Sequence, residues 1–366
     1  MKALRVAIDG RHFARRSTGM SGYAVNLIRA LPHARPDLEM LLLYDHGATV
    51  PLERSRWVKV GGPQYLWKQL GVPRALAANH ADLFHATSGG VPLFSPRPVV
   101  ATILDLLVEV GPRWFPTRVR FQVSATTRLA AARADALIAI SESTKKDLVD
   151  RYRVRPEKIT VIPCGVEDRF RPDIGEEERA RVRQAYGLER PYVLYVGSLF
   201  RWRNLARLVQ AHANLLSRGI EIDLVLAGRD IWGNSDAPAQ VAESGTANQV
   251  HFLGYVANED LPALYAGAEV FAYPSLHEGF GIPPLEAMAS GVPVVVSNAA
   301  SLPEVVGDAG ITVDPNSVEE LTEGLTKAIC DSTVRARMKA GGIERASRFD
   351  WSSVAALTAS VYDRYS

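Results

Sequence analysis

The segment from His277 to Glu286 has the residue types that could bind a sugar nucleotide. It reads His-Glu-Gly-Phe-Gly-Ile-Pro-Pro-Leu-Glu, a loop with two glycines that enters a helix opened by two prolines. Free N–H groups at a helix N-terminus bind a diphosphate well, and proline loses no hydrogen bond in the first turn. Glu278 and Glu286 are eight residues apart. Each carboxylate could accept hydrogen bonds from the hydroxyls of a sugar or a ribose.

Short apolar runs alternate with longer amphipathic stretches, which predicts parallel sheets covered by helices. In such sheets ligands bind at the carboxyl ends of strands. Runs that read as strands are Leu4–Ile8, Met40–Tyr44, Leu83–His85, Val99–Leu104, Ala136–Ile140, Ile159–Ile162, Tyr192–Val196, Ile222–Ala227, Val250–Phe252, Val270–Ala272, Val294–Val296 and Ile311–Val313. Helices are expected over Tyr23–Leu31, Leu205–Ser217, Pro284–Ser290 and Val318–Cys330, with a further helix capped by Ser141.

A change of composition divides the chain into two halves. At about 150 residues per domain, 366 residues predict two domains. The stretch from Glu167 to Arg190 is polar, and Glu176, Glu177 and Glu178 open a charged helix. We therefore expect α/β domains over residues 1–168 and 169–350, with the active site in the cleft between them.

The loop and helix at His277–Glu286 resemble the Glu-x7-Glu motif of the family 4 glycosyltransferases. The resemblance extends in order through nearly the whole chain. Segments similar to the family's other motifs are Thr18–Tyr23, Ala139–Ser143, Val161–Val166, Tyr192–Asn204 and Phe349–Trp351.

The resemblance implies two facing Rossmann-like domains, the GT-B fold. Residues 1–168 would form the acceptor side, residues 351–366 a closing helix that packs back on it, and residues 169–350 the donor-binding domain. It also implies a retaining transferase that needs no metal or other cofactor. The reaction would move a hexose or 6-deoxyhexose from a GDP-, UDP- or dTDP-linked donor to a sugar or lipid-linked acceptor. Cell-surface polysaccharide or lipopolysaccharide assembly is the implied setting.

Carried over by position, Glu278 and Arg203 are the predicted catalytic residues. Glu278 would hold the donor sugar's hydroxyls. Arg203 stands where the family has lysine and would neutralise the leaving diphosphate, since a guanidinium forks onto phosphate oxygens. The predicted donor-binding residues are Glu286, for the ribose, with Gly197, Ser198, Arg201, His277, Gly279, Phe280, Gly281 and Ile282. Residues expected on the acceptor or cleft side are Gly19, Gly22, His85, Leu104 and Asp105.

Several of these residues also have a plainer interpretation. Arg203 could be a solvated charge at a helix start, and Gly19 and Gly22 could be simple turn glycines. His85 ends a predicted strand and should point at the cleft, but it could equally be a structural histidine.

The residue at position 104 gives an indication of the donor sugar. Many family members have a histidine at this position, in a His-Asp-Leu sequence that contacts the sugar's 6-hydroxyl, whereas this chain reads Leu104-Asp105-Leu106. Leucine packs against a methyl group but forms no hydrogen bond. One hypothesis is therefore a 6-deoxy donor, and the alternative is that another side chain makes this contact.

Charge, cysteine content and short motifs limit the possible ligands and the cellular location of the protein. The formal charge of +2 gives no indication of nucleic-acid binding. No Asp-x-Asp occurs in the sequence, so no metal site is predicted, and Cys164 and Cys330 form no close pair. The first residues have too short an apolar stretch for a secretory signal. These features predict a cytoplasmic enzyme.

One stretch indicates contact with a membrane. Residues 113–133 contain five arginines and no acids, so they could meet anionic lipid at the inner face of the plasma membrane. A solvated helix face is the alternative.

Other functions remain open at this stage. A sugar-nucleotide epimerase of the same architecture would convert the donor without an acceptor, and a non-catalytic sugar or nucleotide binder would not turn it over. A nicotinamide dehydrogenase is disfavoured because no Gly-x-Gly-x-x-Gly follows any strand. A pyridoxal-phosphate phosphorylase is disfavoured by the chain length.

Overall fold

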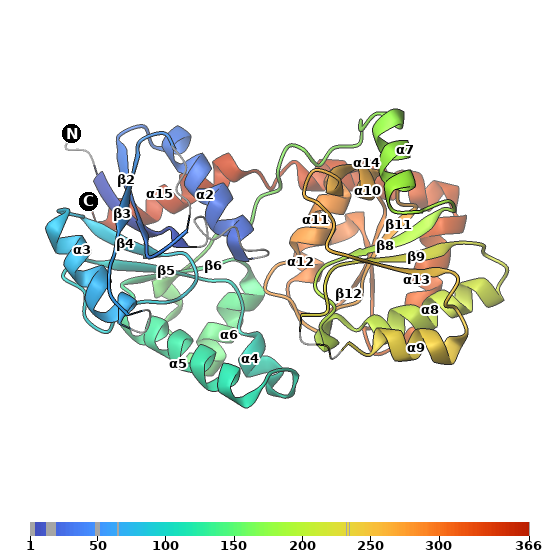
Figure 1. Ribbon diagram of the computed structural model, residues 1–366, viewed down its shortest axis with the longest axis horizontal. Helices are drawn as coiled ribbons and strands as arrows, with labels where there is room; N and C mark the ends of the chain where they lie inside the picture. Colours follow the sequence, from blue (N-terminus) through green and yellow to red (C-terminus); the bar gives the residue numbers. More distant parts are fainter. Residues whose placement is uncertain are drawn as a thin grey trace. The chain divides into compact units, whose positions relative to one another are not determined.

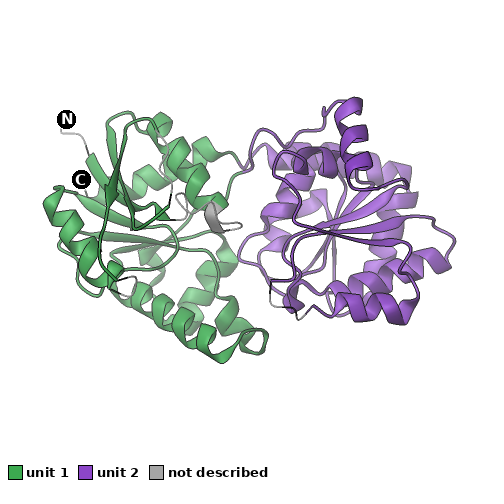
Figure 2. Ribbon diagram, in the orientation of Figure 1, with its two compact units in different colours: residues 1–165, 350–366 green, residues 166–349 purple. Residues whose placement is uncertain are grey.

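A computed structural model describes residues 4–11, 20–47, 52–63, 66–231, 233 and 235–365. The chain forms two compact units, shown in Figure 2. Unit 1 comprises Met1–Gly165 and Asp350–Ser366, and unit 2 comprises Val166–Phe349. The sequence placed the two boundaries at 168/169 and 350/351, whereas the units change at 165/166 and 349/350.

Unit 1 is built on a seven-stranded sheet with the order β3-β2-β1-β4-β5-β6-β7. Every pairing in it is parallel, as apolar runs buried on both faces predict. The strands are β1 (Leu4–Asp9), β2 (Leu38–Tyr44), β3 (Ser55–Lys59), β4 (Leu83–Ala86), β5 (Val99–Ile103), β6 (Ala136–Ala139) and β7 (Ile159–Val161).

Helices cover this sheet, and the last helix of the chain returns to it (Figure 1). Asp350 caps that helix by accepting from the Ser353 backbone N–H at 2.8 Å. Trp351 then packs edge-on against Tyr23, with ring centroids 5.9 Å apart. The helices are α2 (Met20–Ala34), η1 (Trp67–Gly71), α3 (Val72–Ala78), α4 (Leu107–Val110), η2 (Pro112–Trp114), α5 (Thr117–Arg133), α6 (Glu142–Tyr152), η3 (Pro156–Lys158), α15 (Trp351–Tyr362) and η6 (Asp363–Tyr365).

Unit 2 is built on a six-stranded sheet with the order β10-β9-β8-β11-β12-β13, and its strands also pair in parallel. The strands are β8 (Tyr192–Val196), β9 (Asp223–Ala227), β10 (Val250–Gly254), β11 (Val270–Tyr273), β12 (Val294–Ser297) and β13 (Ile311–Val313). The helices are α7 (Glu176–Ala185), η4 (Arg201–Arg203), α8 (Leu205–Ser217), α9 (Ala237–Ser244), α10 (Leu261–Ala266), α11 (Ile282–Ala289), α12 (Leu302–Val306), η5 (Gly307–Ala309), α13 (Val318–Cys330) and α14 (Ser332–Ala346).

Both sheets reverse their strand order at one place. In unit 1 the order changes direction between β1 and β4, and in unit 2 between β8 and β11. Ligands of open parallel sheets bind outside the carboxyl ends of the strands at such a switch point. The loops after these four strands are therefore the places to look for a site.

The structure confirms the predicted α/β class and adds one strand. β3 was missed because Ser-Arg-Trp-Val-Lys is not an apolar run: it lies at the edge of the sheet and none of its residues is fully buried. The predicted cap is confirmed, since Ser141 Oγ accepts from the Thr144 backbone N–H at 3.0 Å.

Candidate active site

An ion pair joins the two switch-point loops of unit 2. Arg203 lies in η4, after β8, and Glu278 lies in the loop after β11. Arg203 Nη1 donates to Glu278 Oε1, and both side chains are largely buried. Burial opposes the charge on Arg203, but Glu278 together with Tyr273 and Tyr195 outweighs this effect, so the pKa of Arg203 rises above its ordinary value. A permanent cation and a carboxylate thus meet where a ligand is expected.

The surrounding side chains hold Arg203 in place. Arg203 Nη1 also donates to the hydroxyl of Tyr273, whose ring centroid lies 5.2 Å from the guanidinium carbon. Asn204 is in the left-handed region with φ 62°, which asparagine tolerates better than most residues. Its side-chain amide donates to the carbonyls of Pro274 at 3.0 Å and Pro315 at 2.6 Å. These bonds fasten the η4 turn to the end of β11.

The glycine loop before α11 adopts a conformation that requires glycine. Gly281 has φ +121°, and a Cβ on it would lie 2.7 Å from a methyl carbon of Leu302. Ser301 Oγ is within donating distance of the carbonyls of Glu278, at 3.0 Å, and Phe280, at 2.6 Å. Gly279 is buried in this loop. Ser301 therefore holds the loop, and α11 begins at Ile282 after a glycine cap that has no side chain to bond the Ile282 N–H.

Glu286 lies inside α11 and is tied to a tyrosine. The Tyr265 hydroxyl donates to Glu286 Oε2 at 2.7 Å. Burial raises the pKa of the Glu286 carboxyl to about 7, although the tyrosine bond and Arg169 favour the charged form. This carboxyl therefore changes its charge near neutral pH.

The remaining predicted donor-binding residues differ in their exposure and contacts. Gly197 has φ +149° and ends β8, and the next residue, Ser198, is partly exposed. His277 precedes Glu278 and is partly exposed. Arg201 is exposed and pairs with Asp236 at 3.2 Å.

The structure corrects the expectation for His85. Its side chain is fully buried, with Nδ1 2.6 Å from the Tyr362 hydroxyl and Nε2 2.8 Å from the Thr102 hydroxyl. The Thr102 hydroxyl lies 3.2 Å from that of Tyr23. Side chains alternate between the two faces of a strand, and His85 points into the layer of α2 and α15. It therefore fastens the closing helix and does not face an open site.

Three other residues expected on the acceptor side, Gly22, Leu104 and Asp105, are exposed or partly exposed. Gly19 lies outside the described residues. Gly22 is exposed in α2, with open space where a Cβ would be. Leu104 and Asp105 follow β5 and are partly exposed, and Asp105 Oδ1 accepts from the Leu107 backbone N–H at 3.0 Å.

A charged cluster at the β1/β4 edge of unit 1 was not predicted. Arg11 binds the buried carboxylate of Asp9 with two bonds, at 2.9 and 2.6 Å, and its guanidinium carbon lies 3.9 Å from the Trp67 ring centroid. Lys68 is close by, and a Cβ on Gly90 would lie 1.7 Å from its amine. Burial and the Arg11 charge lower the pKa of Lys68. The available signal was Asp9, a carboxylate directly after the predicted apolar strand Leu4–Ile8.

The residues that the structure describes contain neither a cluster for a metal ion nor a helix that could span a membrane. Within them, no group of three or more His, Cys, Asp and Glu side chains could hold a metal ion. The helices among them include none that is long and apolar enough to cross a membrane. Cys164 is buried and Cys330 exposed, and both are free.

Two family patterns cover most of the sequence. The pattern described as "Glycosyl transferases group 1" matches residues 176–345, and "Glycosyltransferase Family 4" matches residues 17–170. The O-antigen chain mannosyltransferase B of Escherichia coli is 34% identical, covering 94% of this chain and 96% of the relative. The MMP alpha-(1->4)-mannosyltransferase of Mycolicibacterium hassiacum is 33% identical, covering 73% and 65%.

Solved structures share the architecture. The sucrose-phosphate synthase of Thermosynechococcus elongatus has a TM-score of 0.77 at 22% identity, covering 99% of this chain and 98% of its own. Anabaena Alr3699/HepE in complex with UDP-glucose has a TM-score of 0.78 at 21% identity, covering 99% and 100%. At this identity the likeness establishes the GT-B fold.

Fold and site thus define a glycosyltransferase of the GT-B class. This chain belongs to the family 4 glycosyltransferases. The relatives named here are transferases, and the epimerase alternative has no support among them.

Proposed function

We propose that this enzyme transfers a mannosyl group from a nucleotide diphosphate sugar to a glycan or lipid-linked acceptor, with retention of configuration and without a metal. The buried Arg203–Glu278 pair at the β8/β11 switch point is the observation that carries the proposal. Similarity to an O-antigen chain mannosyltransferase over nearly the full length supports the sugar and the setting. Polysaccharide assembly from nucleotide sugars fits a cytoplasmic enzyme.

Arg203 and Glu278 have complementary tasks in this proposal. Transfer breaks the bond between the sugar's anomeric carbon and the diphosphate oxygen, and it forms a bond to the acceptor oxygen, whose proton is released. Negative charge grows on the diphosphate, and Arg203 is the cation that neutralises it. Glu278 accepts hydrogen bonds from the sugar's hydroxyls and fixes its orientation.

The nucleotide has its own contacts. The backbone N–H groups of Gly281 and Ile282, at the start of α11, would bind the diphosphate, since Pro283 and Pro284 carry no N–H. Gly197 and Ser198 at the end of β8, and the backbone of Gly279–Gly281, allow the close approach that a phosphate or sugar needs. Glu286 accepts from the ribose hydroxyls.

The relatives and Leu104 favour different donor sugars, and a kinetic comparison distinguishes the two. The mannosyltransferase relatives favour a hexose with a 6-hydroxyl, whereas Leu104 favours a 6-deoxy sugar. The test compares kcat/KM for GDP-mannose and GDP-rhamnose in the wild type and in Leu104→His. An apolar pocket discriminates against a hydroxyl by at most about a hundredfold. If Leu104 contacts the sugar, the variant shifts the ratio toward mannose, and an unchanged ratio removes Leu104 from the site.

The direct test of the proposal is a donor panel. The enzyme is incubated with GDP-, UDP- and dTDP-sugars and a short mannose-containing glycan, with and without EDTA. We expect transfer from a mannosyl donor that survives the chelator, and an α-linked product from an α-linked donor by NMR. Loss of turnover in EDTA that magnesium restores would overturn metal independence, and an inverted product would overturn retention.

A further inference from the structure

Two buried tyrosines of unit 2 each bond one end of a charged side chain in the candidate active site. Tyr273, in β11, accepts from Nη1 of Arg203, and Tyr265, in α10, donates to Oε2 of Glu286 at 2.7 Å. Both tyrosines are buried, and this burial raises the pKa of each hydroxyl well above its ordinary value, so both stay neutral. Because protein covers both rings, they act on a ligand only through the charged side chains that they hold.

The contacts of Arg203 leave one edge of its guanidinium group unused. Nη1 carries the bonds to both Tyr273 and Glu278. Nε is buried without a hydrogen-bond partner, and Nη2 forms no hydrogen bond within the described part of the chain. The N–H groups of Nε and Nη2 point the same way from the planar group, so they form a fork that matches two phosphate oxygens. A phosphate at this edge would satisfy a buried donor that is otherwise unpaired.

The two carboxylate oxygens of Glu286 are divided in a similar way. Oε2 accepts from Tyr265, whereas Oε1 forms no hydrogen bond with any residue that the structure describes. The nearby cation of Arg169 favours the charged form of Glu286, but Arg169 is itself paired with Glu167 at 3.1 Å. Oε1 is therefore the atom that can accept from a ribose hydroxyl.

The two tyrosines belong to one packed row of aromatic rings. Phe271 lies between them, since its ring centroid is 5.5 Å from that of Tyr265 and 5.8 Å from that of Tyr273. Tyr195, in β8, stacks on Tyr273 at 5.6 Å, and Phe170 packs edge-on against Tyr265 at 5.5 Å. Close packing restricts each ring to one rotamer. The two hydroxyls are therefore held at fixed positions.

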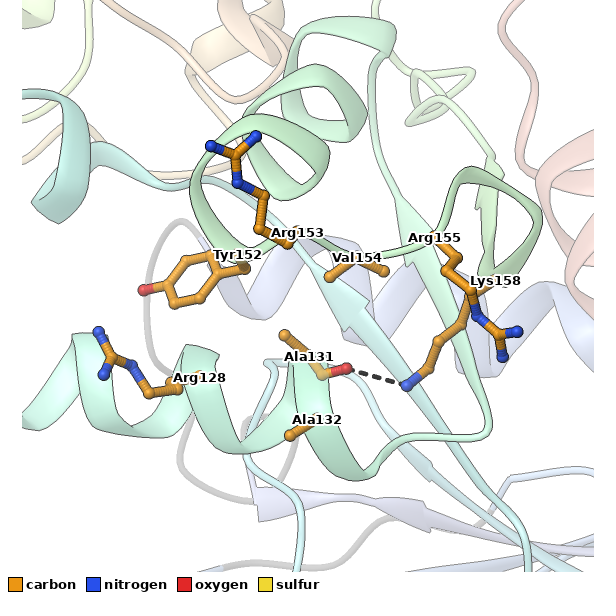
Figure 3. A pocket seen from close by; sticks show the side chains of 8 residues that line it. All are labelled: Arg128, Ala131, Ala132, Tyr152, Arg153, Val154, Arg155 and Lys158. Atoms are coloured by element: carbon orange, nitrogen blue, oxygen red, sulfur yellow. Dashed lines mark hydrogen bonds between the residues drawn. The ribbon is translucent and has the colours of Figure 1, made fainter.

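Two other basic side chains of the protein bond the ends of helices instead. In the hollow of unit 1 shown in Figure 3, Lys158 Nζ donates to the Ala131 carbonyl at 2.9 Å, in the last turn of α5. Arg345 Nη2 donates to the Glu304 carbonyl at 2.6 Å, in α12. Carbonyls at helix ends need such donors. The partners of Arg203 are a hydroxyl and a carboxylate, so its bonds orient the guanidinium group and do not cap a helix.

We propose that Tyr273 and Tyr265 are positioning residues of the donor site. Tyr273 directs the Nε and Nη2 edge of Arg203 at the diphosphate, and it keeps the guanidinium in place when Glu278 turns to the sugar's hydroxyls. Tyr265 directs Oε1 of Glu286 at the ribose. This inference rests on the function proposed above for the three charged residues. Such positioning matters because a misplacement of about 1 Å can slow a reaction by about a hundredfold.

The test compares tyrosine-to-phenylalanine variants of the full chain by calorimetric titration. Tyr273→Phe and Tyr265→Phe each remove one hydroxyl and keep the ring. Tyr192→Phe is the matched control, because the Tyr192 hydroxyl is also buried but donates to the Leu264 carbonyl at 2.7 Å. The probes are GDP and UDP, guanosine and uridine, and the 2′,3′-dideoxy forms of both diphosphates. Thermal unfolding sets the titration temperature, at which every variant must be folded.

Tyr273→Phe should bind the diphosphates about five- to tenfold more weakly than the wild type and bind the nucleosides equally well. Combined with Arg203→Gln, it should cause no further loss, because the group that it positions is gone. A similar loss for the nucleosides, or the same additional loss in the Arg203→Gln protein, would show a general structural effect and overturn the role of Tyr273.

Tyr265→Phe should weaken the binding of GDP or UDP by a similar factor and leave the dideoxy diphosphates unaffected, since these lack the ribose hydroxyls. Equal losses for both kinds of diphosphate would overturn the role of Tyr265. If Arg203→Gln and Glu286→Gln bind every probe like the wild type, the proposed function of these two residues is wrong, and the inference falls with it. If they lose affinity while both phenylalanine variants match Tyr192→Phe, only the positioning roles are wrong.

Discussion

The two switch points of this enzyme share a topology and differ in chemistry. At the β8/β11 edge of unit 2, the cation of Arg203 faces the carboxylate of Glu278. At the β1/β4 edge of unit 1, Asp9 and Arg11 form a pair, but Lys68 adds a second cation. Beneath that edge, His85 takes part in a buried chain of neutral hydrogen bonds. The same strand order thus places the Arg203–Glu278 ion pair in unit 2, whereas in unit 1 it places the hydrogen bonds of His85 that hold α15 on the sheet.

This difference predicts which substitutions affect ligand binding and which affect folding. In our proposal the charged pair of unit 2 exchanges its internal partners for those of a ligand; Arg203 lies in the short η4 turn and Glu278 in a loop. The hydrogen-bond chain of unit 1 joins β4 and β5 to α2 and α15, so its loss affects folding. Substitutions in the two places should therefore have separate consequences.

The largest expected effect is on turnover. Glu278→Gln keeps the side-chain volume but removes the charge that, in our proposal, holds the donor sugar, and we expect kcat/KM to fall by about 100- to 1,000-fold. Glu243→Gln, an exposed carboxylate in α9, is the control and should be unchanged. Because Glu278 is buried against Arg203, both proteins are first compared by thermal unfolding. Near-normal turnover of a folded Glu278→Gln would remove the catalytic assignment.

The second effect is on acid stability and concerns unit 1. Burial lowers the pKa of His85 to about 3, so the native state stays unprotonated where the unfolded chain binds a proton below about pH 6.5. This contribution to stability is present above pH 6.5 and is lost as the pH falls, at about 1.4 kcal/mol per unit. His85→Gln should flatten the unfolding free energy between pH 6 and 4 by about that slope. Parallel pH profiles would mean that His85 titrates normally.

The third effect is a modest pH dependence of nucleotide binding in unit 2. Burial raises the pKa of Glu286 to about 7, and in our proposal the charged form of this residue accepts hydrogen bonds from the ribose hydroxyls. Affinity for a nucleoside diphosphate should therefore rise as the pH increases from 6 to 8, by about fivefold, the difference between neutral and charge-assisted bonds. Glu286→Gln removes this component but leaves the phosphate's own titration, so the two curves are compared. Identical curves would show that Glu286 does not contact the ribose.

The sequence predicted the elements better than the surroundings of single side chains. Apolar runs buried on both faces identify strands such as β8 and β11, but the polar edge strand β3 has no such signal. Glu278 was expected in a loop and lies there, yet its ion pair with Arg203 joins residues 75 positions apart in the sequence and has no local signal. His85 was placed by its position at a strand end, whereas the face to which it points is set by the register and by α15. Lys68 has no local pattern at all, because Arg11 and Gly90 reach it through the fold.

The central claim is that Arg203 binds the donor diphosphate at the β8/β11 switch point. Calorimetric titration of GDP and UDP into wild type, Arg203→Gln and Arg201→Gln tests it most directly, since Arg201 is an exposed arginine two residues away that pairs with Asp236. A lost hydrogen bond to a charged group costs about 1.5–3 kcal/mol of binding free energy. The affinity of Arg203→Gln for the nucleotide should therefore be roughly 10- to 150-fold lower than that of the wild type. Arg201→Gln should bind within about twofold of wild type. Unchanged affinity in Arg203→Gln, or the larger loss in Arg201→Gln, would contradict the account.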